Sequence, residues 1–205
     1  MKTRSIAGPA GALQILEEIP AGTPAAVALI CHPHPLHGGS LSNKVVHQLA
    51  KTFAGLGAVC IRFNFRGVGE SEGEYDEGRG ELQDLLAVVA WAQARWPELP
   101  LWLSGFSFGG FIALQGAQQL APQRLVTVAP AINYFPDDSS FDLPGVSWLL
   151  IQGDADDIVF AALVTGWTAR LDFQPQLALL EGAGHFFHGR LNELKQSIVD
   201  SFSAD

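Results

Sequence analysis

The sequence has few of the features that mark disulfide-bonded, membrane-spanning or nucleic-acid-binding proteins. Cysteine occurs twice in 205 residues, as Cys31 and Cys60 in apolar segments, so we expect two structural thiols and no disulfide framework. No apolar run approaches the roughly 20 residues of a membrane helix, and none near the N-terminus suits a secretory signal. The 12 basic residues form no cluster and are outnumbered by 21 acidic ones. We therefore expect a cytoplasmic protein with no nucleic-acid or membrane partner.

Apolar residues and glycine are plentiful. The composition is 48% hydrophobic and 16% charged, with 22 glycines spread along the chain. This composition is typical of a compact α/β protein and excludes a disordered chain. The length fits one domain, and no repeat or linker divides it, so we expect a single domain over residues 1–205.

Short apolar runs alternate with amphipathic stretches along most of the chain, which predicts an α/β architecture. A mostly parallel central sheet with helices on both faces follows from this alternation. Ligands bind at the carboxyl ends of the strands in such sheets, so we expect the chemistry in the loops that follow them. We predict a hairpin over residues 2–19, strands over 26–31, 58–65, 101–105, 125–129, 147–152 and 176–180, and helices over 40–56, 80–96, 109–120, 159–171 and 191–202.

A G-x-S-x-G motif lies between the predicted strand 101–105 and the predicted helix 109–120, with Ser107 at its centre. A serine that projects from a tight strand-to-helix turn needs small neighbours two residues away, and Gly105 and Gly109 satisfy this. The helix that follows directs its N-terminal amides toward the same point, so the Phe108 N–H is the expected donor to an oxyanion. The alternative is a glycine-rich turn with an incidental serine.

A serine nucleophile needs a base, and His185 is the stronger of two candidates. It follows the predicted strand 176–180 within a glycine-bracketed segment, whereas His188 lies nearer the final helix. The acid is less determined, because Asp154, Asp156 and Asp157 all follow the strand 147–152. A carboxylate that orients the histidine should lie in the loop above its strand, which fits the first two, and the third is better explained as a helix cap. The residues alone leave Asp154 and Asp156 open.

These motifs, in this order, resemble the α/β-hydrolase superfamily. The G-x-S-x-G motif precedes G-x-x-D-x-x-V, which begins at Gly153, and then G-x-G-H. The resemblance implies the α/β-hydrolase fold and assigns the acid to Asp156. The segments 31–39 and 64–71 further resemble small bacterial hydrolases related to dienelactone hydrolase. That enzyme uses a cysteine nucleophile where this chain has Ser107, so its substrate is not implied.

The same resemblance places a second oxyanion donor in the loop after strand 26–31, where the backbone N–H of His34 is the candidate. Proline has no N–H, which removes Pro33 and Pro35. His32, His34 and His37 also form an H-x-H-x-x-H cluster. If this cluster bound a metal, the protein would be a metal-dependent hydrolase, which is the alternative prediction. We expect no metal and no other cofactor, since a loop shaped by proline and glycine explains the composition.

The connection over residues 130–145 is too short for a helical cap domain, so we predict an open active site. Tyr134 and Phe135, with Phe141, are expected to form an apolar wall that binds substrate. The predicted function is a serine hydrolase, a carboxylesterase that cleaves short acyl esters of small molecules. A thioesterase, peptidase or lactonase with the same triad is the alternative, and a non-catalytic binding protein is the alternative outside enzymes. The expected partner is a small acyl molecule, and protein partners stay unknown.

Overall fold

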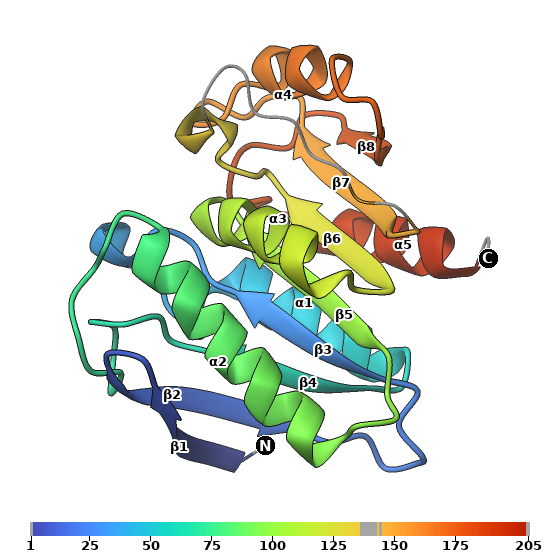
Figure 1. Cartoon of the computed structure of the whole chain (residues 1–205). Helices are drawn as coiled ribbons and strands as arrows, with labels where there is room; N and C mark the ends of the chain where they lie inside the picture. The colour runs from blue at the N-terminus through green and yellow to red at the C-terminus, as the bar shows by residue number, and fades with distance from the viewer. Residues whose placement is uncertain (1, 136–142, 144, 204–205) are drawn as a thin grey trace.

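One mixed sheet organises the chain. The computed structural model describes residues 2–135, 143 and 145–203. In this part of the chain eight strands form a sheet of order β1-β2-β4-β3-β5-β6-β7-β8 (Figure 1). The six strands from β4 to β8 along this order are parallel, and the hairpin β1–β2 adds to β4 in the antiparallel sense. The bounds are Lys2–Gly8 for β1, Gly11–Glu18 for β2, Ala26–Cys31 for β3, Ala58–Phe63 for β4, Leu101–Phe106 for β5, Arg124–Val128 for β6, Ser147–Gly153 for β7 and Gln176–Leu180 for β8. The predicted sheet and hairpin are confirmed.

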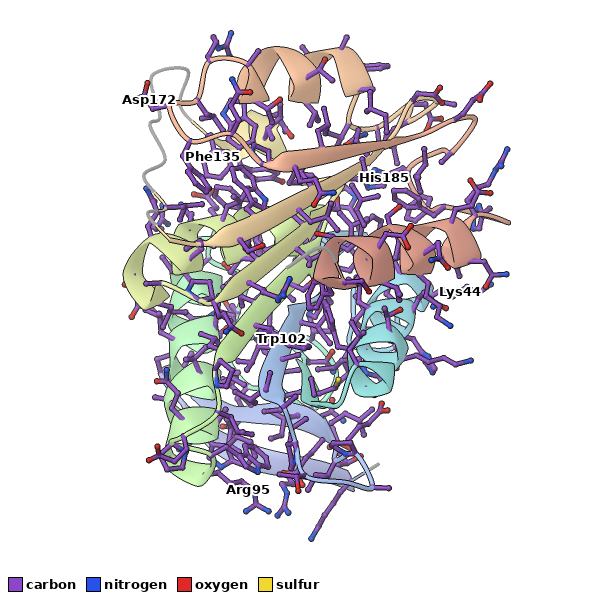
Figure 2. The ribbon with its side chains drawn as sticks, turned by 90° about the vertical axis from the view of Figure 1, so that its right-hand side faces the viewer. Lys44, Arg95, Trp102, Phe135, Asp172 and His185 are labelled. Atoms are coloured by element: carbon purple, nitrogen blue, oxygen red, sulfur yellow. The ribbon has the colours of Figure 1, made fainter. Side chains whose placement is uncertain are left out.

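Helices cover both faces of this sheet. Figure 2 shows the two helical layers on either side of the strands, with side chains filling the space between them. One layer holds α1 (Lys44–Gly55) and α5 (Leu191–Ser203), and the other holds α2 (Arg79–Arg95), α3 (Phe108–Leu120) and α4 (Ala161–Thr168). The chain therefore has the α/β-hydrolase architecture that its motifs indicate.

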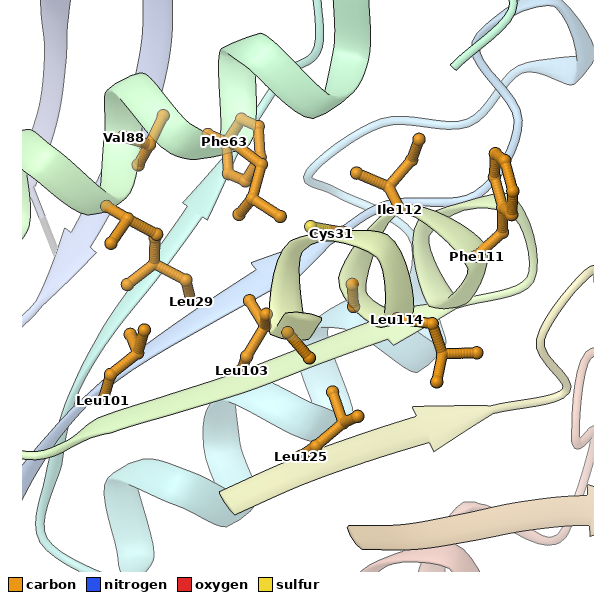
Figure 3. Close-up of a cluster of buried hydrophobic side chains, with 14 of the residues drawn as sticks. Leu29, Cys31, Phe63, Val88, Leu101, Leu103, Phe111, Ile112, Leu114 and Leu125 are labelled. Atoms are coloured by element: carbon orange, nitrogen blue, oxygen red, sulfur yellow. The ribbon is translucent and has the colours of Figure 1, made fainter. Parts of the chain in front are cut away.

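Alternating side chains of the central strands build a separate core on each face. In β3, Val27, Leu29 and Cys31 pack toward α2 and α3, whereas Ala28 and Ile30 pack toward α1 and α5. Figure 3 shows Leu29 and Cys31 within the first of these cores. Every residue of β3, β4 and β5 is buried, which is why these strands appear in the sequence as mainly apolar runs, interrupted by Arg62 in β4 and by Ser104 in β5.

Both cysteines are free and buried, as expected for structural thiols. Burial raises the pKa of both, to about 12 for Cys60. A thiol with so high a pKa carries little thiolate near neutral pH, so neither is an activated nucleophile.

The fourth helix differs from its prediction. Residues 159–171 are expected to be helical, but α4 spans Ala161–Thr168. The N–H groups of Ile158 and Val159 donate to Asp156 Oδ1 at 2.9 and 2.8 Å, which keeps these residues in the loop. Asp157 is exposed and is not the helix cap, because Phe160 occupies that position. The apolar run at 158–160 is therefore the end of a loop.

The connection between β6 and β7 carries no cap domain in its described part. This part contains the short 3-10 helix η2 (Ile132–Tyr134), and Phe141 lies outside the described residues. Of the helices described, none has the length and apolar character needed to cross a membrane.

A buried ion pair ties the loop after β4 to α2. Asp84 is fully buried, and its carboxylate accepts hydrogen bonds from the Arg66 guanidinium, the shortest at 2.8 Å, and from the Arg66 N–H at 2.9 Å. Arg66 thus supports this loop through hydrogen bonds.

Asp84→Ala should lower the free energy of unfolding by about 3 to 5 kcal/mol, because it leaves a largely buried guanidinium without its anion. Urea denaturation measures this loss. Arg79→Ala is the control: it removes an exposed ion pair with Asp76 and should leave the urea midpoint unchanged. Equal effects of the two substitutions would show that the Arg66–Asp84 pair does not anchor the loop.

Candidate active site

Ser107 lies in the sharp turn that joins β5 to α3. Its backbone has φ 55° and ψ −120°, a conformation that L-residues rarely adopt. Its N–H donates to the Val128 carbonyl at 2.9 Å, which fixes the turn against β6. A Cβ at Gly105 would collide with the Gly109 carbonyl, and a Cβ at Gly109 would collide with the carbonyl of Cys31. The two glycines of the motif are therefore required by close packing of the backbone.

His185 reaches this serine from the loop after β8. The distance from His185 Nε2 to Ser107 Oγ is 3.0 Å, and that from His185 Nδ1 to Asp156 Oδ2 is 2.8 Å. The carboxylate can only accept, so Nδ1 carries the proton of the neutral ring and Nε2 is left to accept from the hydroxyl. The rings of Phe106 and Phe186 pack against the imidazole, with centroids 5.0 and 5.1 Å from its own. The histidine is 4% exposed.

Asp156 is a buried carboxylate with a full set of hydrogen-bond donors. Its Oδ1 accepts from the N–H groups of Ile158 and Val159, and its Oδ2 accepts from His185 and from Gln152 Nε2 at 3.0 Å. Burial raises the pKa of this carboxyl, but the hydrogen bonds from His185 and the two backbone amides outweigh burial and hold the pKa below its ordinary value. The group is thus ionised near neutral pH.

The rival residues lie elsewhere. Asp154 is exposed, and its carboxylate accepts from the Gly182 N–H at 2.6 Å, which links the loops after β7 and β8. Asp157 and His188 are also exposed. Of the acids that the sequence leaves open, the structure brings Asp156 alone to the histidine ring.

The two expected oxyanion donors lie at one cavity. Phe108 is the first residue of α3, so its N–H has no acceptor within the helix. His34 precedes the short 3-10 helix η1 (Pro35–His37) in the loop after β3. Its Nδ1 accepts from the Leu36 N–H at 3.2 Å, so its Nε2 carries the proton and donates to Tyr75 Oη at 3.2 Å. Burial and the neighbouring His37 lower the pKa of His34, so its ring is neutral near neutral pH.

His32 is structural. It is fully buried; its Nδ1 lies 2.6 Å from the Pro33 carbonyl, and its Nε2 accepts from the Phe65 N–H at 3.0 Å. Neither ring nitrogen has a lone pair free for a metal, so the cluster of three histidines cannot act as three ligands. No group of three or more metal-binding side chains occurs among the described residues.

A cavity of about 340 Å³ opens above Ser107. Tyr134 lines it as predicted, but Phe135 does not, because its ring stacks on Trp167 with centroids 5.7 Å apart. Phe186 and Ile158 also line the cavity, although they are 45% and 56% exposed. The sequence analysis did not find them, although each is an apolar residue within two positions of a triad candidate. The remaining lining residues are Pro33, His34, His37, Gly38, Gly39, Asn43, Phe108, Ala131, Asn133, Val159 and His185.

His32 should make the protein less stable in acid. Burial lowers its pKa from 6.5 to about 4, with the adjacent His34 acting in the same direction and the bond to Pro33 opposing it. The unfolded state therefore takes up the proton first, and stability falls as the pH drops from 6.5 toward 4. The separation of about 2.5 pH units corresponds to about 3 kcal/mol.

Urea denaturation at several pH values between 7.5 and 4.5 measures this contribution. His32→Gln should be less stable at pH 7.5 and should lose less stability on acidification than the wild type. His47→Gln, at an exposed histidine of α1, is the control and should keep the wild-type slope. If stability fell equally with pH in His32→Gln and in the wild type, His32 would not be a source of the acid sensitivity.

Comparison with known proteins agrees with the fold and the motifs. Residues 24–150 match the family Hydrolase_4, described as serine aminopeptidase, S33. An α/β serine hydrolase without a lid from Xanthomonas campestris is 39% identical with a TM-score of 0.93, covering 99% of this chain and 94% of that chain. An α/β serine hydrolase homologue from Coxiella burnetii is 40% identical with a TM-score of 0.91, covering 97% and 96%.

A more distant relative has a named activity. The lysophosphatidylserine lipase ABHD12 of Danio rerio is 31% identical over 142 residues, which are 62% of this chain. The matched part spans 37% of that lipase, so its activity does not transfer directly. The family match covers more than half of the chain, and the two bacterial structures agree with it over nearly the whole length. The chain belongs to the Hydrolase_4 family of α/β serine hydrolases.

Proposed function

We propose that this protein is a carboxylesterase that cleaves short acyl esters through an acyl-enzyme on Ser107. The observation that carries the proposal is the line of hydrogen bonds from Asp156 through His185 to the serine hydroxyl, at 2.8 and 3.0 Å. Ser107 and Asp156 lie 78 and 29 positions from His185 in the sequence, and the three side chains meet at the carboxyl edge of the sheet. This is the geometry that nucleophile activation requires.

In the first half of the reaction, His185 Nε2 removes the proton of Ser107 as its oxygen attacks the ester carbonyl. The imidazolium that forms is stabilised by Asp156, whose low pKa keeps it ionised throughout. The backbone N–H groups of Phe108 and His34 bind the oxyanion. The histidine then gives the proton to the departing alcohol, and the acyl group remains on the serine.

In the second half, water takes the place of the alcohol. His185 removes a proton from the water as it attacks the acyl carbonyl, and the same two N–H groups bind the second oxyanion. The proton returns to Ser107 Oγ as the carboxylic acid leaves. The imidazole packs on Phe106 and Phe186, which holds it in one orientation for both steps.

An uncharged ester suits the cavity. No Asp, Glu, Lys or Arg is among the described residues that line it, and the rings of Tyr134 and Phe186 with Ile158 offer apolar surface to an acyl chain. A relative named as a lipase supports carboxylic esters as the substrate class. A thioesterase, peptidase or lactonase would use the same triad. A non-catalytic binding protein would have no need of the strained Ser107 backbone or of a buried Asp–His pair.

A fluorophosphonate tests the proposed nucleophile. The wild type should form one adduct, on the peptide that contains Ser107, and peptide mapping by mass spectrometry locates it. Ser107→Ala should lose both the adduct and the hydrolysis of 4-nitrophenyl butyrate while keeping its circular dichroism spectrum. Ser104→Ala, at a buried serine of β5 that donates to the Val126 carbonyl, is the matched control and should keep labelling. Folded wild-type protein without an adduct would refute the esterase.

The charge of the acyl group should decide which esters are cleaved. We expect kcat/KM for 4-nitrophenyl butyrate to exceed that for mono-4-nitrophenyl succinate at least about 10-fold, because no Lys or Arg among the described lining residues can pair with the extra carboxylate. Initial rates with both esters measure the ratio. Asn133→Lys places an ammonium group in the lining of the cavity and should reduce the ratio of the two kcat/KM values. Equal rates in the wild type would contradict an uncharged acyl subsite.

A further inference from the structure

We propose that Gln152 is a positioning residue of the catalytic acid: it fixes the Asp156 carboxylate and limits how strongly that carboxylate stabilises a protonated His185. The inference rests on the proposed function, because it assigns a role within the same triad. Gln152 is the penultimate residue of β7 and is fully buried. Its place at the end of the strand brings its side chain to the loop that carries the acid.

The amide nitrogen of Gln152 lies among three acceptors. Gln152 Nε2 is 2.8 Å from the Val159 carbonyl, 3.0 Å from Asp156 Oδ2 and 3.3 Å from the Gly153 carbonyl. Two of these acceptors belong to the loop that the Asp156 carboxylate itself organises. Gln152 therefore holds the carboxylate and the backbone that follows it with one side chain.

This orientation of the amide has a cost. Gln152 Oε1 is buried and has no hydrogen-bond partner among the described residues. A buried carbonyl without a donor costs about 1 to 3 kcal/mol, whereas an apolar residue of similar size would cost nothing. The residues before it in β7, from Trp148 to Ile151, are apolar and buried. Packing alone therefore does not account for a glutamine at this position.

The bond to Asp156 affects the histidine because both groups share one oxygen. Asp156 Oδ2 accepts from Gln152 and from His185 Nδ1, so the two donors compete for the same negative charge. Without Gln152, more of this charge would be available to the imidazolium, and the His185 ring would hold its proton to higher pH. The carboxylate would also lose one of the bonds that set its plane, so His185 would be less well aligned with Ser107.

Other titratable groups lie around the pair. Asp154 and Asp157 are exposed on the same loop, His188 is exposed after His185, and His34 lies across the cavity. Within the described residues, no hydrogen bond or ion pair joins any of these four to Asp156 or His185. Besides His185, Gln152 is thus the side chain among the described residues that donates to the Asp156 carboxylate.

Gln152→Met tests the role, since methionine is close in length and has no N–H. We expect kcat for 4-nitrophenyl butyrate to fall about 10-fold with KM unchanged. In the plot of kcat/KM against pH, the midpoint of the acid limb should move to a pH higher by about 0.5 to 1 unit. Gln152→Leu, which also has no N–H, should move the acid limb in the same direction and keeps the test available if the methionine variant does not fold.

Thr127→Val is the matched control. Thr127 is buried in β6, and its hydroxyl accepts from Trp148 Nε1 at 3.0 Å without contact to the triad. This variant should lose stability in urea but keep the wild-type kcat and acid limb. An unchanged acid limb in the Gln152 variants, or an equal movement in Thr127→Val, would overturn the inference. Fluorophosphonate labelling separates the two proposals, since an unlabelled wild type would refute the esterase itself.

Discussion

The turn at Ser107 is the constraint on which the rest of the site depends. The chain must pass from β5 directly into α3, and it does so with a positive φ that is held by the bond to Val128 and by two glycines. Gly109 lets the first turn of α3 approach the carbonyls at the end of β3, which brings the loop containing His34 beside the amide of Phe108. The strained turn therefore determines both the height of the serine above the sheet and the distance between the loops that face it.

The loop after β7 keeps the Asp156 carboxylate ionised although the side chain is buried away from water. Asp156 is 3% exposed, and burial alone would favour its neutral form. Donors on both oxygens reverse this preference. The same bonds to Ile158 and Val159 delay the start of α4, and this places the Ile158 side chain at the mouth of the cavity. Ionisation of Asp156 and the shape of the cavity wall at Ile158 thus come from one set of hydrogen bonds.

Much of the fold could be predicted because strands buried on both faces appear as uninterrupted apolar runs, as in β3, and because amphipathic stretches alternate with them. Local patterns failed where a distant residue decided the outcome. Phe135 looks like a wall residue until Trp167, thirty-two positions away, is seen to stack on it. The run at 158–160 looks like the start of a helix because the sequence does not show that Asp156 binds its amides. The sequence does mark Gln152 as unusual, since it is a polar residue at the end of an apolar strand.

Three histidines show how burial and partners, not residue type, determine the chemistry of a ring. Both nitrogens of His32 bond to the backbone, and burial keeps that ring neutral, so it can only join the loops after β3 and β4. His34 uses Nδ1 to close its own turn and Nε2 to reach Tyr75, so its ring holds the loop that carries the proposed oxyanion donor. His185 alone has a carboxylate on one nitrogen and a hydroxyl on the other. That arrangement lets a ring take a proton and return it within one reaction, as the proposed mechanism requires of His185.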